Sequence, residues 1–325
     1  MTDIHFDGDP LFLVTGGAGF IGSHIVHALV GLGLRVRVLD DLSTGRLSNL
    51  CTVDGPAKVV QASLTDAASV ARAVQGADYV LHQAAIPSVP RSVKDPVTSN
   101  NANINGTLNL LVAARDAGVK RVVYASSSSV YGDTPTLPKV ETMPMRPKSP
   151  YALQKGTAEE YCRVFTEVYG LETVSLRYFN VFGPRQDPTS QYTGVIAKFA
   201  TALLTGQRPT IFGDGLTSRD FTFVANNVRA NLLACLAPAA AAGQTMNVAC
   251  GDRITLLELL AEMQRLLGTN LEPVFAPDRE GDVKHSQADI SKARALLGYE
   301  PMVGFADGLA QTVAWYEENH ARTGN

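Results

Sequence analysis

The chain has 325 residues, of which 45% are hydrophobic and 18% charged, and its formal net charge is -3 at pH 7. This length is enough for one large or two ordinary domains with a substantial core. Lys and Arg together number 28 against 31 Asp and Glu, so no excess of positive charge is available for phosphate backbones. We therefore expect no nucleic-acid partner.

The cysteines and the N-terminal residues indicate the compartment. The four cysteines, Cys51, Cys162, Cys235 and Cys250, form no CxxC pair, so we expect neither a disulfide framework nor a zinc site. We interpret them as small buried hydrophobic residues in a reducing environment. The first ten residues carry three Asp and no Lys or Arg, and no run of about 18 apolar residues occurs. We therefore expect a cytoplasmic protein with no membrane partner.

The first half of the chain alternates short apolar runs with helical stretches, a pattern typical of a parallel sheet covered by helices. One helix is expected near 103–117 and another from Pro150 to Gly170. The apolar face of the first contains Ile104, Leu108, Leu111 and Val112. Strands are expected at 11–15, 35–39, 58–61, 79–82, 121–125 and 173–177. The predicted fold class is α/β, a doubly wound parallel sheet of the Rossmann type.

Beyond Phe179 the alternation loosens, because Gly-Pro at 183–184 and Gly-Asp-Gly at 213–215 mark loops. One more helix is expected near 226–236. We predict that residues 1–179 form the doubly wound domain, to which 222–243 returns. Residues 180–221 and 244–325 are predicted to form a smaller, loop-rich α/β lobe.

The first predicted strand runs into a glycine-rich turn, TGGAGFIG at 15–22, which a helical segment follows. In this context backbone N–H groups can meet a pyrophosphate at the positive end of a helix. Gly16, Gly19 and Gly22 have the spacing GxxGxxG rather than GxGxxG. Because a tight strand-to-helix turn needs glycine anyway, the motif alone leaves open whether a dinucleotide binds.

Asp40 stands at the end of the second strand, 18 residues past Gly22. A carboxylate there can accept both hydroxyls of a ribose and would repel a 2′-phosphate, so the position favours NAD over NADP. Two alternatives stay open. Asp40 and Asp41 could merely cap the next turn, and Arg46 could accommodate a 2′-phosphate.

Tyr151 and Lys155 form a YxxxK pair whose spacing places both side chains on one helix face. A phenol has an ordinary pKa of about 10, and we expect the ammonium one turn away to lower the pKa of Tyr151. Such a pair can take a proton from a sugar hydroxyl while a nicotinamide takes the hydride. Since YxxxK occurs often by chance, the pair alone would indicate only a surface Tyr and Lys.

Four consecutive serines, at 126–129, directly follow the fifth predicted strand. Ligands bind at the carboxyl ends of the strands in an open parallel sheet. Burying hydroxyls there costs free energy unless they are used, and capping explains one or two serines rather than four. The serines therefore support a site that includes Tyr151 and Lys155.

Together these motifs resemble the extended short-chain dehydrogenase/reductase superfamily, which contains nucleotide-sugar epimerases and dehydratases. The motifs are TGGAGFIG at 15–22, HQAA at 82–85, SSSSVYG at 126–132 and SPYALQK at 149–155. Three more motifs resemble UDP-hexose 4-epimerases, especially those acting on N-acetylated sugars. They are RYFNVFGPRQDP at 177–188, GDGLTSRDF at 213–221 and GDVKHSQAD at 281–289. The resemblance extends from Leu11 to about Leu297.

The resemblance implies NAD as the cofactor and Ser127, Tyr151 and Lys155 as catalytic residues. The implied cofactor contacts are Gly16, Gly19, Phe20, Ile21, Gly22, Asp40, Asp41, Ser43, Thr44, Gly45, Ser63, Leu64, Gln83, Ala84, Ala85, Asn103, Ser126, Tyr151, Lys155, Tyr178 and Phe179. Ser63 stands where an Asp usually meets the adenine, which puts that contact in doubt.

For the substrate the resemblance implies a UDP-sugar. The implied contacts are Ser88, Ser127, Ser128, Ser129, Tyr151, Asn180, Gly194, Val195, Arg219, Arg279, Asp282 and Ser286. Ser286 matches a gatekeeper position that is small in enzymes accepting N-acetylated sugars, whereas Pro87 departs from the small or basic residue expected near the sugar. Arg219 and Arg279 could also be ordinary surface ion pairs, although arginine suits bidentate phosphate contact.

Within the superfamily, the residues favour C4 epimerisation with NAD bound throughout turnover. A 4,6-dehydratase normally has an Asp-Glu pair where Ser128 and Ser129 stand. We expect UDP-GlcNAc and UDP-GalNAc as substrates and leave UDP-Glc and UDP-Gal open. The alternatives are a UDP-glucuronate 4-epimerase, against which Asn180 argues, another NAD-dependent UDP-sugar oxidoreductase, and a catalytically silent NAD-binding module.

The family also implies a homodimer, formed through the helices that contain Leu108 and Tyr161. We expect no metal site, because His24 and His27 have no third ligand nearby and are interpreted as helix-surface or packing residues.

Overall fold

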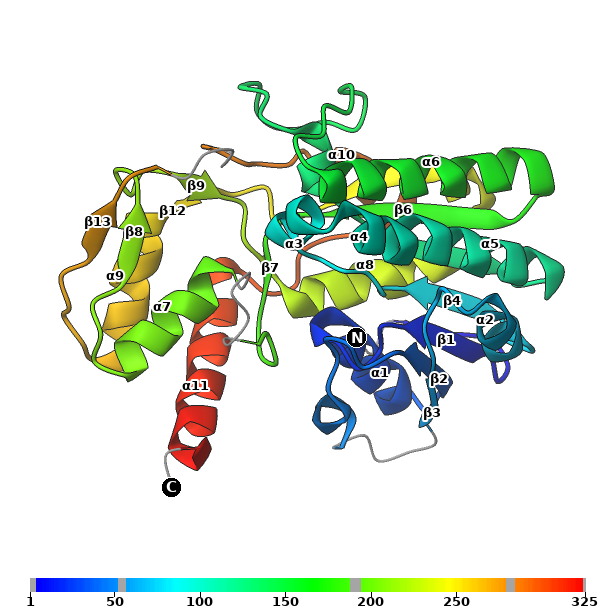
Figure 1. Ribbon diagram of the computed structural model, residues 1–325, viewed down its shortest axis with the longest axis horizontal. Helices are drawn as coiled ribbons and strands as arrows, with labels where there is room; N and C mark the ends of the chain where they lie inside the picture. The colour runs from blue at the N-terminus through cyan, green and yellow to red at the C-terminus, as the bar shows by residue number, and fades with distance from the viewer. Residues whose placement is uncertain (1–3, 52–56, 188–193, 279–283, 324–325) are drawn as a thin grey trace.

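The structure, a computed structural model, describes residues 4–51, 57–187, 194–278 and 284–323. Its larger part is one parallel sheet of seven strands in the order β11-β6-β5-β4-β1-β2-β3, at the right of Figure 1. The strands are β1 (Leu11–Thr15), β2 (Arg35–Asp40), β3 (Ala57–Gln61), β4 (Tyr79–His82), β5 (Arg121–Ser127), β6 (Glu172–Tyr178) and β11 (Gln244–Val248). The six strands predicted from the sequence are all present, each within two residues of its expected bounds, and the doubly wound fold class is confirmed.

Helices cover both faces of the sheet, which is why nearly every residue of β1, β4, β5 and β6 is buried. One face carries α1 (Phe20–Gly31), α8 (Val224–Leu236) and α10 (Ser291–Leu297). The other carries α2 (Ala67–Val74), α5 (Gly106–Asp116) and α6 (Pro150–Tyr169). Short helices α3 (Val89–Lys94) and α4 (Pro96–Asn100) contact α6, and a π-helical turn (Asn101–Asn105) leads into α5. Single 3₁₀ turns occur at Leu47–Leu50, Ser128–Tyr131 and Ala239–Ala241.

Helix α6 begins and ends where its sequence predicts. The Ser149 side chain accepts a hydrogen bond from the N–H of Ala152, and Pro150 occupies the first turn. Gly170 ends the helix in the left-handed conformation, with φ +72°. This helix holds Tyr151 and Lys155 against the carboxyl end of β5, so its bounds position the candidate site.

The smaller lobe, at the left of Figure 1, is more helical than the loop-rich lobe that we expected. Helices α7 (Val195–Leu204), α9 (Leu256–Leu267) and α11 (Phe305–Thr323) pack around their own apolar core. Three strand pairs complete the lobe. They are β7 (Val181–Phe182) with β10 (Thr222–Phe223), β8 (Thr210–Phe212) with β13 (Val274–Ala276), and β9 (Ser218–Arg219) with β12 (Ile254–Thr255).

The expected boundary after residue 243 needs correction. The segment 244–248 is strand β11, which pairs with β6 in the large sheet, and α10 packs on it. Both elements therefore belong with the larger part and not with the smaller lobe. Strand β11 has only one neighbour, so its first residues remain half exposed and its sequence is less apolar than that of a central strand.

The cysteines differ in burial. Cys162 and Cys235 are buried as predicted, whereas Cys51 is exposed and Cys250 half-buried, so burial of all four was wrong. Within the described ranges, no helix is long and apolar enough to cross a membrane. The same ranges contain no group of three His, Cys, Asp or Glu residues that could hold a metal ion.

Candidate active site

The glycine turn joins β1 to α1 through two close backbone approaches. Gly16 has φ +66°, and a Cβ built on it would lie 2.7 Å from backbone atoms of Ala84. A Cβ on Gly22 would lie 2.1 Å from the carbonyl oxygen of Gly16, so the turn excludes any larger residue at both positions. Helix α1 follows Gly19 without a side-chain cap, which leaves its positive end open to an anionic group.

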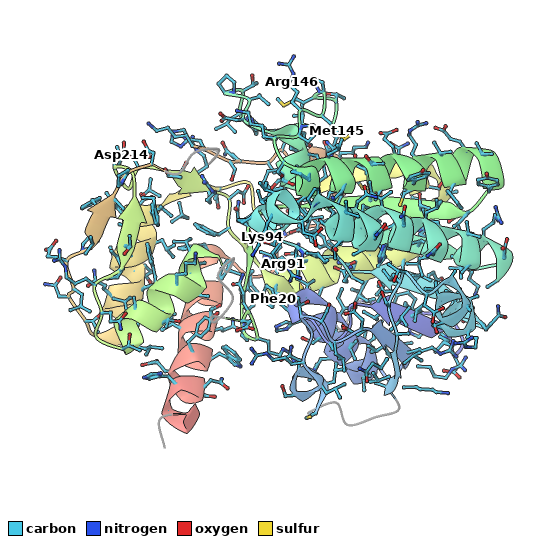
Figure 2. The ribbon with its side chains drawn as sticks, in the orientation of Figure 1. Phe20, Arg91, Lys94, Met145, Arg146 and Asp214 are labelled. Atoms are coloured by element: carbon cyan, nitrogen blue, oxygen red, sulfur yellow. The ribbon has the colours of Figure 1, made fainter. Side chains whose placement is uncertain are left out.

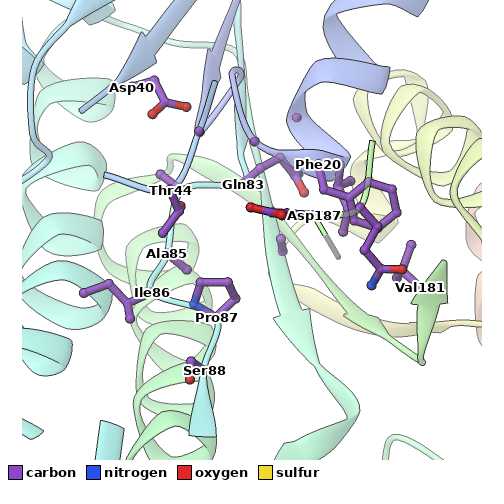
Figure 3. A pocket seen from close by; sticks show the side chains of 18 of the residues that line it. Phe20, Asp40, Thr44, Gln83, Ala85, Ile86, Pro87, Ser88, Val181 and Asp187 are labelled. Atoms are coloured by element: carbon purple, nitrogen blue, oxygen red, sulfur yellow. The ribbon is translucent and has the colours of Figure 1, made fainter. Parts of the chain in front are cut away.

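A cavity of about 1370 Å³ extends from this turn to the serine segment after β5. A pocket for one drug-sized ligand measures about 300–1,000 Å³, so this cavity has room for more than one ligand. Figure 3 shows Asp40 near one end of its wall and Ser88 near the other, with Phe20 and Val181 on the opposite side. The predicted residues that line it are Gly16, Gly19, Phe20, Ile21, Gly22, Asp40, Asp41, Ser43, Thr44, Gly45, Ser63, Leu64, Gln83, Ala84, Ala85, Ser88, Ser126, Ser127, Ser128, Ser129, Tyr151, Lys155, Tyr178, Asn180 and Gly194.

Asp40 is buried at the cavity wall and its carboxylate accepts the backbone N–H groups of Ala18 and Leu42, both at 2.9 Å. Burial raises the pKa of Asp40. The capping alternative is therefore true of this residue, but it does not exclude a ligand, because the residue also lines the cavity. Arg46 was the residue that could accommodate the 2′-phosphate of NADP. Its guanidinium is already engaged, because it pairs with Asp187 at 2.6 Å.

Ser127, Tyr151 and Lys155 converge on one part of the cavity wall from β5 and α6. Burial raises the pKa of Tyr151 to about 12, and a hydrogen bond with Ser127 opposes that rise. Burial lowers the pKa of Lys155 to about 8, and its Nζ donates to the carbonyl oxygen of Ala125 at 2.7 Å. The expectation that Lys155 lowers the pKa of Tyr151 is therefore wrong for this structure, because burial of the phenol outweighs every other influence on it.

Tyr178 also lines the cavity, but its hydroxyl is fully engaged. The phenol donates to Gln83 Oε1 at 3.2 Å and accepts from Asn231 Nδ2 at 2.6 Å, while Gln83 Nε2 donates to Asn231 Oδ1 at 3.0 Å. These three side chains close a ring of hydrogen bonds on the face of the sheet that α8 covers. Of the two tyrosines, Tyr151 is thus the one whose hydroxyl can exchange a proton with a ligand.

Some predicted residues lie behind the cavity wall. Asn103 is buried, accepts the N–H of Ile86 at 2.8 Å and donates to Gln154 at 2.9 Å. Phe179 belongs to the apolar core under β6. Ser286 lies outside the lining and its hydroxyl accepts from Asn180 Nδ2 at 3.0 Å. These three can act only through the residues that they hold.

Two more predicted residues, Val195 and Arg219, line a second cavity of about 240 Å³ in the smaller lobe. Asn180, Val181, Gln186 and Gly194 line both cavities, so the two spaces adjoin. Asn180 has φ +34°, an uncommon backbone conformation for a residue other than glycine, at the end of β6. The predicted contacts Arg279 and Asp282 lie outside the described residues.

The structure adds lining residues that sequence reasoning missed. Arg91 and Ile86 line the large cavity, and Lys198, Phe212 and Thr217 line the small one. Ile86 follows strand β4 within a few residues, so the rule that ligands bind at strand carboxyl ends could have pointed to it. Arg91, labelled in Figure 2, lies further along the chain in α3. The residues of the small cavity come from α7, β8 and the loop after it, and no local pattern marks them.

The two histidines of α1 contact backbone carbonyl oxygens of neighbouring loops. His24 Nε2 lies 2.9 Å from the carbonyl oxygen of Pro184, and His27 Nε2 lies 2.9 Å from that of Asn49. Both rings therefore tie α1 to neighbouring loops. This agrees with the packing role expected from the sequence.

The glycine turn, the uncapped helix, the acidic residue after β2 and the long cavity fit a dinucleotide such as NAD. A Rossmann-type sheet with this turn and a Tyr-Lys helix at the carboxyl end of its strands defines a nucleotide-dependent oxidoreductase-type enzyme. The sequence matches the model of the NAD dependent epimerase/dehydratase family over residues 12–249, and the chain belongs to that family. This confirms the resemblance and the prediction of an NAD-dependent enzyme.

Known proteins of several activities are similar along the whole chain. A UDP-glucose 4-epimerase of Mycolicibacterium smegmatis is 42% identical over 308 residues, which cover 94% of this chain and 97% of that protein. The structure of UDP-N-acetylglucosamine 4-epimerase from Methanobrevibacter ruminantium, in complex with UDP-N-acetylmuramic acid, matches with a TM-score of 0.91 and 40% identity over 96% of this chain and 99% of its own. The structure of a Thermus thermophilus UDP-glucose 4-epimerase in complex with NAD matches with a TM-score of 0.86 and 40% identity. The match covers 94% of this chain and 98% of that chain.

Proposed function

We propose that this chain is a UDP-sugar 4-epimerase that keeps NAD bound through turnover and acts on UDP-GlcNAc and UDP-GalNAc. The observation that carries the proposal is the position of Ser127, Tyr151 and Lys155 on a cavity large enough for a dinucleotide and a second ligand. The names of the similar proteins, 4-epimerases of UDP-glucose and UDP-N-acetylglucosamine, support it.

The two adjoining cavities suit the two ends of a UDP-sugar. In the smaller one, Phe212 and Phe221 offer apolar ring surface for a planar base, and Arg219 and Lys198 offer cations for a diphosphate. Asn180, which lines both cavities, would lie where the diphosphate passes from one to the other. The sugar would then reach Ser88 and the serine segment in the larger cavity.

The reaction would be a reversible oxidation at C4 of the sugar. When bound, NAD would supply the acceptor for the C4 hydride and return that hydride to the opposite face of the ring. Tyr151, as phenolate, would take the O4 proton as the C4–H bond breaks and would return it when the 4-keto sugar is reduced. The hydrogen bond with Ser127 would favour the phenolate, since it opposes the rise in the pKa of Tyr151 that burial causes. No net oxidation results.

The residues beside Ser127 support epimerisation over elimination of water. Ser129 donates to Ser127 Oγ through its backbone N–H at 3.2 Å and its hydroxyl at 2.9 Å. Ser128 and Ser129 have hydroxyl groups, which are poor acids and bases near neutral pH. Neither can replace the carboxyl pair that a 4,6-dehydratase needs at that place.

The preference for N-acetylated sugars rests on Ser286. Its hydroxyl accepts a hydrogen bond from Asn180 Nδ2 at 3.0 Å, and Asn180 lines both cavities. Ser286 would therefore act through Asn180, because a small residue behind this wall leaves more room for an acetamide group on the sugar than a large one would. A bulky residue at the same position would restrict the site to plain hexoses.

The test is incubation of the purified protein with UDP-GlcNAc, UDP-Glc and UDP-GlcA in separate reactions followed by proton NMR. We expect UDP-GalNAc from the first reaction, with no free NADH released, and no product from a Tyr151→Phe control. Absence of product from both UDP-GlcNAc and UDP-Glc would contradict the proposal. Turnover of UDP-GlcA alone would support a glucuronate epimerase instead.

We also propose that the protein is a homodimer formed by the face of α4, α5 and α6. Val97, Leu153 and Val168 on this face are 69%, 56% and 65% exposed, and Leu108 and Tyr161 are half-buried between them. Figure 1 shows α5 and α6 side by side on the outside of the sheet. Monomeric proteins rarely expose a continuous apolar helical face, so a second copy is the expected cover.

A further inference from the structure

A fully buried ion pair lies behind the candidate catalytic residues. Arg177, on β6, donates from Nη2 to Glu159 Oε1 at 2.5 Å and from Nε to Glu159 Oε2 at 3.0 Å. The side chains of Arg177 and Glu159 are only 4% and 3% exposed. Ser126 Oγ donates to the same carboxylate at 2.7 Å. Both carboxylate oxygens are therefore occupied, and Glu159 holds α6 to β5 and β6.

Glu159 lies one helical turn beyond Lys155 on α6, a spacing at which a lysine and a glutamate are neighbours and attract each other. The two side chains also reach consecutive residues of β5, because Lys155 Nζ donates to Ala125 O and Glu159 accepts from Ser126. Nevertheless, no ion pair joins Lys155 to Glu159 in the parts of the chain that the structure describes. Arg177 and Ser126 instead occupy the carboxylate of Glu159.

We propose that Arg177 is a positioning residue, which engages Glu159 so that the Lys155 ammonium stays directed at the cavity. The inference rests on the proposed function, since it concerns the same helix. Arginine suits this task because its guanidinium is always charged and binds a carboxylate with two parallel hydrogen bonds. Without it, a buried carboxylate would need another cation, and Lys155 lies one helical turn away on α6. Arg163, one turn in the other direction, is paired with Glu160 and Glu167.

Other charged or titratable groups surround Lys155 and Arg177. His82 of β4, Tyr124 of β5 and Cys162 of α6 surround Lys155, and the Tyr124 ring lies 5.0 Å from its Nζ. On the other side, the Tyr131 ring lies 4.6 Å from the Arg177 guanidinium.

Lys292 of α10 lies close enough to sense the charges of Glu159, Arg177 and Glu141. It is therefore the one rival cation for Glu159 among the groups that surround the pair in the described structure. If Lys292 paired with Glu159 in the absence of the Arg177 guanidinium, Arg177→Met would leave Lys155 unaffected.

The test compares Arg177→Met with the double variant Glu159→Gln/Arg177→Met. In the single variant we expect NAD affinity of the apoenzyme to fall about tenfold or more and the pKa of Lys155 to rise, because the free carboxylate captures its ammonium. The lysine would be followed by NMR of ¹³Cε-labelled lysine, with the signal assigned from Lys155→Met. The double variant has neither buried charge. Its NAD affinity should return to within about threefold of the wild type, and the pKa of Lys155 to within about half a unit.

Arg121→Met is the matched control. Arg121 of β5 pairs with Glu172 of β6 at 2.5 Å, at the end of the strands away from the cavity, and the Arg121 side chain is 6% exposed. We expect it to lower the thermal midpoint and leave both NAD affinity and Lys155 unchanged.

A folded Arg177→Met with unchanged Lys155 titration and NAD affinity would overturn the inference. A folded double variant that binds NAD as poorly as the single variant would also overturn it, and this arm stays informative if the single variant does not fold. Both measurements are made without turnover. A wild type that does not epimerise UDP-sugars but shows these shifts would therefore contradict the proposed function and leave the inference standing.

Discussion

The hydroxyl of Ser92 accepts a hydrogen bond from the backbone N–H of Tyr151, at 3.0 Å. Ser92 is fully buried in α3 and donates in turn to the carbonyl oxygen of Val89 at 2.7 Å. Tyr151 is in the first turn of α6, where N–H groups have no partner within the helix. Residues from another helix thus complete the N-terminus of α6 at the residue that the proposed reaction uses.

We expect Ser92→Ala to lower kcat several-fold with little change in KM, because the start of α6 loses the contact that fixes Tyr151. The free energy of unfolding should fall by about 1 kcal/mol, the usual cost of a lost helix cap. Steady-state kinetics with UDP-GlcNAc and urea unfolding would measure the two effects. The matched control is Asp66→Ala, which removes the cap of α2 at Ser69 N away from the cavity and should lower stability alone. Equal loss of kcat in both variants would contradict the positioning role.

The two cavity tyrosines predict opposite phenotypes. Tyr151→Phe should lower kcat by about 10²–10⁴-fold, the range for loss of a general acid-base group, with an unchanged thermal midpoint. Tyr178→Phe leaves Gln83 Oε1 without its donor and removes one of the two hydrogen bonds that Asn231 Nδ2 donates. It should therefore lower stability by about 1–3 kcal/mol while kcat falls less than about tenfold. Thermal unfolding and kinetics of both variants give the comparison. If Tyr178→Phe were the more inactive of the two, the assignment of Tyr151 as acid and base would be wrong.

Buried neutral histidines predict how stability depends on pH. His82 lies between Thr15 and Thr107, at 2.7 and 2.9 Å, and burial lowers its pKa to about 3. Burial also lowers the pKa of His24 to about 3. As pH falls below about 6.5, these histidines become protonated in the unfolded chain but stay neutral in the folded chain. Each histidine should therefore lower the free energy of unfolding by about 1.4 kcal/mol per pH unit down to about pH 3.

Asp220 acts in the opposite sense. Burial raises its pKa to about 6, so the folded chain binds a proton there before the unfolded chain does, and stability from this group is lost as pH rises from about 3.8 to 6. Two histidines outweigh one carboxyl, and urea unfolding between about pH 4.5 and 6.5 should still show a net loss of stability on acidification. His82→Asn should reduce the dependence of the unfolding free energy on pH by the contribution of one proton, about 1.4 kcal/mol per pH unit. Thr15→Val keeps the imidazole of His82, so it should lower stability at every pH without changing the slope. An unchanged slope in His82→Asn would show that His82 is not a source of the pH dependence.

The proposed dimer face predicts a clean change of oligomeric state. Leu153→Glu places a charge on the exposed apolar face near the start of α6, where burial against a second copy would leave it unpaired. Light scattering should show a dimer for the wild type and a monomer for this variant. Leu216→Glu, an equally exposed leucine (53%) in the smaller lobe, serves as the control and should stay dimeric. A monomeric wild type would contradict the proposal outright.

Much of the site could be predicted because its signals are local. The bounds of α6 follow from Ser149, Pro150 and Gly170, and the position of Asp40 follows from the end of an apolar strand. Each depends on residues a few positions apart, for which capping and hydrophobic patterning give direct evidence. The carboxyl-end rule for parallel sheets then gathers the strand ends into one site.

Pairings between distant segments could not be predicted in this way. Asn231 lies in the middle of α8 with no local signal, yet it closes the hydrogen-bond ring of Gln83 and Tyr178 because α8 packs on β5 and β6. The Glu159–Arg177 pair likewise depends on how α6 lies on the sheet. Strand β11 was misassigned because an edge strand buries less surface, which weakens the apolar pattern.

Gly45 gives a prediction about the proposed ribose site. A Cβ at this position would lie 2.9 Å from both carboxylate oxygens of Asp40 and 3.0 Å from the Cβ of Ala18, closer than real atoms pack. We therefore expect Gly45→Ala to displace the Asp40 carboxylate and to lower NAD affinity about tenfold, since the carboxylate would no longer meet both hydroxyls of a ribose. Calorimetric titration of the apoenzyme with NAD measures this.

Gly31→Ala is the matched control for this change. A Cβ at Gly31, near the end of α1, would meet nothing within 4 Å, and its backbone is helical. The substitution should keep NAD affinity and raise the free energy of unfolding by about 0.4–1 kcal/mol, because alanine has fewer unfolded conformations to lose. If Gly45→Ala bound NAD as tightly as Gly31→Ala did, Asp40 would not be the residue that holds the ribose. Its carboxylate would then serve only the backbone N–H groups of Ala18 and Leu42.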